Sequence, residues 1–125
     1  MAAFICKQKG ADAMLIVSKY GEIRLTRGDT ANLIVTPTIG EGEEKQPYIV
    51  KEDDVLIFTV KKSYEDTEAV IEKEITGSTT FHLKPADTKG LAFRKYKYDV
   101  QLKTSDGDNY TFIDKKDFII TEEVG

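Results

Sequence analysis

The sequence predicts an all-β fold, either a two-sheet sandwich or a barrel, built from short strands. Apolar and polar residues alternate with a period of two along most of the chain. Turn-forming sequences such as Arg27-Gly28-Asp29 and Ser105-Asp106-Gly107-Asp108 separate these segments, and no segment sustains a helical period. Because several strands have a polar outer face, the pattern favours a sandwich whose outer faces meet solvent.

The alternation predicts the strands in the following order. Strands are expected over 22–26 and 31–36, on either side of the Arg27-Gly28-Asp29 turn, and then over 54–62, 69–76 and 79–83. Residues 85–91 are expected to form a crossing loop, with room for one helical turn. The last strands are expected over 95–103, 109–113 and 117–121, with a hairpin at the Asp-Gly pair between the first two.

Two strands supply half of the predicted core. Segment 54–62 is apolar on both faces, as in a central strand that is buried on both sides. In segment 95–103, Tyr96 and Tyr98 share the apolar face, opposite Lys95 and Lys97. The full set of expected core residues is Ile23, Leu25, Leu33, Val35, Ile57, Phe58, Ile71, Tyr96, Tyr98, Val100, Leu102 and Phe112.

Length and composition indicate one globular domain. The chain has 125 residues, of which 40% are hydrophobic and 32% charged, which is too apolar for a disordered chain. We expect residues 1–21 to form an N-terminal arm or first strand and residues 22–125 to form the sandwich. The apolar runs are far shorter than the ~20 residues of a membrane-spanning helix, and no signal peptide is recognised. The sequence therefore predicts no membrane partner.

No pattern predicts catalysis or a cofactor. His82 is the only histidine and Cys6 the only cysteine, and neither lies in a nucleophile motif. His82 alternates with Phe81 and Leu83, which predicts an outward-facing strand residue. The acids of Asp106-Gly107-Asp108 lack the spacing of a calcium loop, and glycine-rich phosphate loops are absent. We therefore expect no catalytic, cofactor-binding or metal-binding residues.

Two groups of residues are predicted to have structural roles. Gly28 lets the backbone turn within Arg27-Gly28-Asp29, and Asp29 can fix that turn by accepting hydrogen bonds from nearby amides. The same tripeptide is read by integrins, but three residues match by chance often. Tyr98, together with Asp87 and Thr88, is predicted to tie a corner of the sandwich through its hydroxyl group.

Segment Arg94-Lys95-Tyr96-Lys97-Tyr98 combines bases with aromatic rings, as a platform for single-stranded nucleic acid would. The alternation turns the tyrosines away from Lys95 and Lys97, and the net charge of the chain is −4. We therefore expect no nucleic acid partner.

An ordered set of segments resembles a known family. The set comprises Ile23-x-Leu25-x-Arg27-Gly28-Asp29-Thr30, the run 53–62, Leu83-x-Pro85-x-Asp87-Thr88-x-x-Leu91, Tyr96-x-Tyr98-Asp99-Val100-Gln101-Leu102, and the closing Asp106-Gly107, 111–113, 118–120 and Val124. This order is similar to small tail and baseplate proteins of phages and prophages of Gram-positive bacteria. The nearest parallel is the N-terminal immunoglobulin-like domain of the phage baseplate upper protein.

The resemblance implies an immunoglobulin-like antiparallel β-sandwich of about seven to nine strands. It also implies a structural, non-enzymatic role in the virion. The expected partners are other virion proteins, or further copies of this chain in a symmetric ring. The protein would be found in the virion, or in the host cytoplasm before lysis. The alternative is a surface-binding sandwich module, an adhesin or a carbohydrate-recognition domain, using an exposed Tyr20, Tyr48 or Tyr64.

Overall fold

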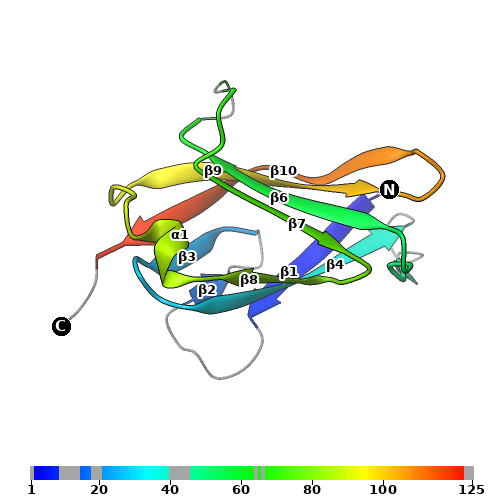
Figure 1. The fold of residues 1–125 in the computed structure, drawn as a ribbon, viewed down its shortest axis with the longest axis horizontal. Coiled ribbons are helices and arrows are strands. Elements are labelled where there is room, and N and C mark those ends of the chain that lie inside the picture. Colours follow the sequence, from blue (N-terminus) through cyan, green and yellow to red (C-terminus); the bar gives the residue numbers. More distant parts are fainter. Residues whose placement is uncertain are drawn as a thin grey trace.

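The fold is an all-β sandwich with one short helix, seen in a computed structural model (Figure 1). The structure describes residues 2–8, 15–17, 21–39, 46–63, 65 and 67–122. The elements are β1 (Ala2–Gln8), β2 (Leu15–Val17), β3 (Ile23–Thr26), β4 (Ala31–Ile39), β5 (Gln46–Pro47), β6 (Val55–Lys61), β7 (Ile71–Thr76), β8 (Thr80–Leu83), α1 (Pro85–Thr88), β9 (Lys95–Lys103) and β10 (Asn109–Thr121).

The strands form two sheets. The larger sheet has the order β2-β3-β10-β9-β6-β7, and the smaller sheet places β4 between β1 on one side and both β5 and β8 on the other. In Figure 1 the β2–β3 end of the larger sheet curls toward the smaller sheet, and β1 contacts β2. The predicted all-β sandwich is therefore confirmed. Both β1 and β2 fall within residues 1–21, where an arm or first strand was expected.

The larger sheet is mixed, where a purely antiparallel sandwich was expected. Strand β3 runs parallel to β10, with Ile23 opposite Phe118 and Leu25 opposite Ile120. The described residues also form ten strands, one more than the expected range, because the short β2 and β5 add to the ladders. The predicted strands 109–113 and 117–121 are one strand, β10. Its ladder with β9 shifts register after Thr111 and again after Ile113, so β-bulges carry the strand across the expected gap.

The core lies between the two sheets. Phe58 is at its centre, with its ring centroid 5.6 Å from that of Phe81, 5.5 Å from Tyr98 and 5.9 Å from Phe118. The buried apolar residues are Ile23, Leu25, Ala31, Leu33, Val35, Leu56, Phe58, Val60, Ile71, Phe81, Leu83, Tyr96, Tyr98, Val100, Leu102, Ile113, Phe118 and Ile120.

Two of the expected core residues need comment. Ile57 is half-buried, because β6 turns Leu56, Phe58 and Val60 to the core and Ile57 to the outer face. A second layer covers only one face of the larger sheet, so the expectation of burial on both sides was wrong. The side chain of Phe112 lies outside the described residues.

The sandwich has two loop-bearing ends (Figure 1). At one end, the turn after β3, α1 and the segment before β9 come together. At the other end, the segment before β6 meets the β9–β10 hairpin, because Val55 pairs with Lys103. The candidate sites lie at these two ends and on the outer face of the larger sheet.

Candidate functional site

The predicted turn and part of the predicted corner come together at one end of the sandwich. The Gly28 amide donates to Thr88 Oγ1 at 2.8 Å, and the Asp29 amide donates to the Thr26 carbonyl at 3.2 Å. Gly28 has a φ of 86°, which the third position of a type II turn requires and which glycine adopts freely. Thr88 is fully buried although it is polar. The turn and α1 are therefore joined by a hydrogen bond across 60 residues.

Arg27 is held against the same corner. Its Nη1 donates to the Leu91 carbonyl at 3.3 Å, and its guanidinium lies 4.1 Å from the centroid of the Phe93 ring. Such a cation–π contact is worth about 0.5–1 kcal/mol at an exposed site. All three residues of the Arg-Gly-Asp tripeptide are half-buried. The structure thus packs the tripeptide into the corner, unlike a protruding adhesive loop.

Asp87 links α1 to the opposite sheet. Its carboxylate accepts a hydrogen bond from the Lys84 amide at 2.7 Å and lies 2.8 Å from Lys73 Nζ on β7. Burial alone would raise the pKa of the Asp87 carboxyl, but these contacts outweigh it and hold the pKa below its usual value. Asp87 therefore caps the helical turn and joins the two layers.

Tyr98, the third residue of the predicted corner, acts elsewhere. It is buried, and its hydroxyl donates to the backbone carbonyl of Gly21, just before β3. The bond at the start of β9 is made by Tyr96, whose hydroxyl donates to the Ala92 carbonyl at 3.0 Å. A similar bond, from a tyrosine near the start of a strand to the backbone a few residues upstream, occurs in immunoglobulin-like sandwiches, where it is called the tyrosine corner. The sequence signal for Tyr96 was its place as the first inward residue of the strand.

A second polar cluster, at the opposite end, was missed by sequence reasoning. Asp54 is fully buried and accepts hydrogen bonds from the Tyr48 hydroxyl at 2.7 Å, the Lys51 amide at 2.9 Å and the Ser105 amide at 3.3 Å. The carboxylate thus joins the segment before β6 to the β9–β10 hairpin. The sequence did contain a signal for this role, because Asp54 directly precedes a strand that is apolar on both faces. Pairs of adjacent acids are common, however, in a chain with 22 acidic residues.

The charges in this cluster shift two pKa values. Burial alone would raise the pKa of the Asp54 carboxyl, but the hydrogen bonds from Lys51, Tyr48 and Ser105 outweigh it and lower the pKa. The hydrogen bond to Asp54, with burial and the charges of Asp54 and Asp106, raises the pKa of Tyr48 to about 12. Tyr48 is half-buried, and its hydroxyl is engaged in the hydrogen bond to Asp54. Tyr20 and Tyr64 lie outside the described residues.

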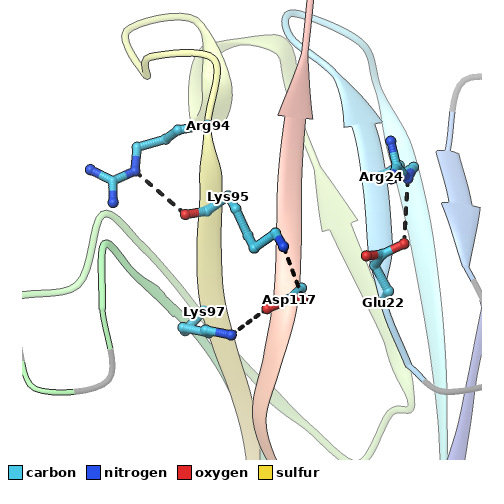
Figure 2. Close-up of polar contacts among 6 residues, drawn as sticks. All are labelled: Glu22, Arg24, Arg94, Lys95, Lys97 and Asp117. Carbon is cyan, nitrogen blue, oxygen red and sulfur yellow. Dashed lines mark hydrogen bonds and ion pairs between the residues drawn. The ribbon is translucent and has the colours of Figure 1, made fainter.

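The basic and aromatic segment 94–98 separates into two faces. Tyr96 and Tyr98 are each 1% exposed, which confirms that their rings point into the core. Figure 2 shows Lys95 and Lys97 on the outer side, both paired with Asp117 of β10, at 3.7 Å for Lys95. The hydrogen bond from Lys97 lowers the pKa of the Asp117 carboxyl, against the effect of burial. The aromatic rings are thus unavailable for stacking bases.

The remaining candidates have local roles. His82 is exposed on β8, as expected, and its Nδ1 lies 2.8 Å from Asn32 Oδ1. The hairpin at Gly107 is closed by the Thr104 amide, which donates to the Asp108 carbonyl at 2.9 Å. Among the described residues, no three histidine, cysteine or acidic side chains gather in a metal-binding group. The side chain of Cys6, on β1, lies outside the described residues.

A hollow of about 480 Å³ lies beside the loop between β6 and β7, lined by Lys62, Thr67, Glu68, Ala69 and Val70. Its described lining comes from this one loop and carries no aromatic ring.

Comparison of the chain with protein-family models, with curated proteins and with solved structures found no match. The function is therefore inferred from the residues and their geometry.

Proposed function

We propose that this chain is a non-enzymatic structural protein of a phage or prophage virion, of the tail or baseplate type, that acts by protein–protein assembly. The observation that carries the proposal is that the buried polar side chains hold parts of the fold together. Asp54, Thr88 and the two buried tyrosines of β9 each make a hydrogen bond that ties one loop or strand of the fold to another. Their chemistry supports a rigid scaffold.

The resemblance to phage tail and baseplate proteins supports the same proposal. Its segments coincide with elements that build the corners and the core. Residues 23–30 form β3 and its turn, residues 53–62 form β6 with its buried Asp54, and residues 83–102 include α1 and most of β9. The segments that carry the resemblance are thus segments that build the sandwich, as expected if the resemblance reflects a shared structural role.

The proposed partners are other virion proteins, in the particle or in the host cytoplasm before lysis. Among the described residues, no helix is long and apolar enough to cross a membrane. The loops at the two ends and the charged outer face of the larger sheet are the surfaces available to such partners (Figures 1 and 2).

The test is a fractionation of phage particles. The source bacterium is induced to release prophage, the particles are banded on a density gradient, and the fractions are probed with an antibody against this protein. The proposal expects the protein to band with intact particles, in a fixed ratio to a major tail protein. Particles that form without it, with the protein left in the cell extract, would contradict the proposal.

A further inference from the structure

One loop of the sandwich leaves a large apolar side chain almost wholly in water. Ile49, in the segment before β6, is 82% exposed, more than any other large hydrophobic residue that the structure describes. Phe93 is the next most exposed, at 45%, and the Arg27 guanidinium lies over its ring, 4.1 Å from the centroid. Single apolar residues are normal on a protein surface, so the setting of Ile49 decides whether it has a role.

The loop that carries Ile49 is anchored by a buried carboxylate. Asp54 is fully buried, which is costly for a charge, and its carboxylate accepts hydrogen bonds from the loop and from the neighbouring hairpin. The Tyr48 hydroxyl donates to it at 2.7 Å and the Lys51 amide at 2.9 Å, so residues on both sides of Ile49 are bonded to one group. The Tyr48 amide also donates to the Pro37 carbonyl at 2.8 Å. A loop held in one conformation loses less conformational entropy on binding than a mobile loop does.

Further apolar surface adjoins Ile49. Tyr48 and Val50, its neighbours in the chain, are half-buried and pack against the core. Tyr110 is half-buried in the same way and lies next to the β9–β10 hairpin, which meets the loop at this end of the sandwich (Figure 1). Tyrosine rings are enriched in protein–protein interfaces, where they pack around the residues that carry most of the binding energy.

Carboxylates flank this apolar surface. Residues 51–54 and 103–108 hold five acids against two bases, a formal charge of −3 in ten residues, whereas the whole chain carries −4. The two segments lie together, because the Ser105 amide donates to the Asp54 carboxylate at 3.3 Å. The exposed acids are Glu52, Asp53, Asp106 and Asp108. We call residues 48–54 together with residues 103–108 the acidic end.

We propose that the acidic end docks on another virion protein, at an apolar pocket set in a surface rich in lysine and arginine. Ile49 enters the pocket, the exposed parts of Tyr48 and Tyr110 cover its edge, and the carboxylates face the bases around it. Burial of the isoleucine supplies affinity, and opposite potentials speed the encounter and fix the orientation. The inference rests on the proposed function in taking a virion protein as the partner, and it adds the docking surface and the chemistry of the partner.

The charge of the acidic end selects among the possible partners. Its carboxylates repel the phosphates of nucleic acids and of anionic lipid headgroups. A second acidic end is disfavoured for the same reason, so two copies do not pair through this surface. A basic protein surface is favoured, and it must offer an apolar pocket, because burying Ile49 against charged groups would take those groups out of water without a partner.

The test is a competition inside the assembling particle. The source bacterium makes the wild-type chain and one variant at equal levels, prophage is induced, and the particles are banded on a density gradient. Peptides that span the substitution distinguish the two forms by mass spectrometry. The enrichment ratio is the variant-to-wild-type ratio in the particles divided by the same ratio in the lysate. Particles form in every sample, because the wild-type chain is always present.

Two variants remove the two parts of the contact. Ile49→Ser removes the apolar group and Asp53→Lys reverses one charge, and each should lower the enrichment ratio to about 0.1 or less. Ile49→Val keeps an apolar side chain, and Glu72→Lys makes the same charge change on β7, so both should enter particles as the wild type does. The three positions are exposed, and urea denaturation verifies that each variant folds. Incorporation of Ile49→Ser or of Asp53→Lys equal to that of the wild type would overturn the inference.

A photo-crosslinking amino acid in place of Ser105, which is exposed on the hairpin, identifies the partner. The expected product joins this chain to a different virion protein, within a segment that has lysine or arginine beside apolar residues. A product with a second copy of this chain, or with an acidic segment, would contradict the inference. A wild-type chain that does not band with particles overturns the proposed function, and this inference falls with it. A wild-type chain that bands with particles beside an equally incorporated Ile49→Ser chain overturns this inference alone.

Discussion

The Gly28 amide and the Thr88 hydroxyl lie 2.8 Å apart and join the turn after β3 to helix α1. Both partners belong to groups that the sequence marked as structural, although they were assigned to separate features. The bond lies in the corner that also holds Arg27 and Phe93. Its removal is therefore a test of how that end of the sandwich is held.

Replacing Thr88 by valine keeps the shape of the side chain and removes the acceptor. The Gly28 amide then lies part-buried without its partner, so we expect a loss of about 1–3 kcal/mol in the free energy of unfolding. Thr88→Ser retains the hydroxyl and should lose less. Urea denaturation measures both, and equal stabilities for the wild type and Thr88→Val would contradict the assignment.

The two tyrosines of β9 can be compared by removing only their hydroxyl groups. Tyr98→Phe leaves the buried carbonyl of Gly21 without its donor and should cost about 1–3 kcal/mol. Tyr96→Phe should cost about 0.5–1 kcal/mol, because Ala92 is exposed and water can replace the lost donor. Equilibrium unfolding in urea measures the loss of unfolding free energy in each variant. A larger loss for Tyr96→Phe than for Tyr98→Phe would contradict the prediction.

Gly77 and Gly107 form a matched pair with positive φ angles of 65° and 94°. A Cβ at Gly77 would lie 2.8 Å from the Glu52 carbonyl oxygen, whereas one at Gly107 would meet nothing within 4 Å. Gly107→Ala should cost about 1–2 kcal/mol, from the backbone angle alone. Gly77→Ala should cost at least about 1 kcal/mol more, because the loop before β6 must move. Thermal melts of the two variants decide the comparison, and equal losses would show that the close contact is easily relieved.

The lowered pKa of Asp54 predicts acid sensitivity. A carboxyl whose folded-state pKa lies below its ordinary value of 3.8 contributes stability above that pH, and the contribution is lost as the pH falls through the folded-state value. Asp54→Asn should therefore lose about 1.5–3 kcal/mol at neutral pH, and its deficit should shrink in acid. Asp53→Asn, at the exposed neighbour, is the control. The measurement is urea unfolding from neutral pH into acid, and a pH-independent deficit would contradict the prediction.

The raised pKa of Tyr48 predicts the opposite dependence. A phenol whose folded-state pKa is about 12 contributes stability that is complete below its ordinary value of 10.0 and is lost as the pH rises toward 12. The difference in unfolding free energy between wild type and Tyr48→Phe should be about 1 kcal/mol at neutral pH and should shrink above pH 10. Denaturation curves of both proteins across this pH range measure the difference in unfolding free energy. A difference that stays constant with pH would show that the hydrogen bond to Asp54 does not raise the pKa of Tyr48.

The alternation of residue types accounts for the parts of the fold that were predicted well. In β9, Tyr96, Tyr98, Val100 and Leu102 all face the core, because a period of two assigns one face of a strand. The same rule could not assign β6, where both faces are apolar. Which face is buried depends on where the second sheet lies, and the structure places Phe58 inward and Ile57 outward.

The parts that sequence reasoning missed depend on contacts between distant segments. The parallel pairing of β3 with β10 joins residues nearly 100 positions apart, and periodicity carries no information about such a pairing. The hydroxyl of Tyr98 donates to the carbonyl of Gly21, 77 positions away in the sequence. The predicted corner instead grouped Tyr98 with Asp87 and Thr88. The role of Asp54 depends on the Ser105 amide of another loop. Local patterns identified the buried strands, and the partners of the polar groups required the three-dimensional arrangement.

The contact between Lys73 and Asp87 has a consequence for how the molecule meets other strands. Strand β7 ends the larger sheet, and Lys73 stands on its inner face, opposite Phe58 in the ladder. An inward-pointing charge on an edge strand is a known protection against edge-to-edge aggregation, because a new strand would bury the ammonium group. The β7 edge therefore disfavours pairing with a further strand, and with it the growth of amyloid-like fibres along that edge.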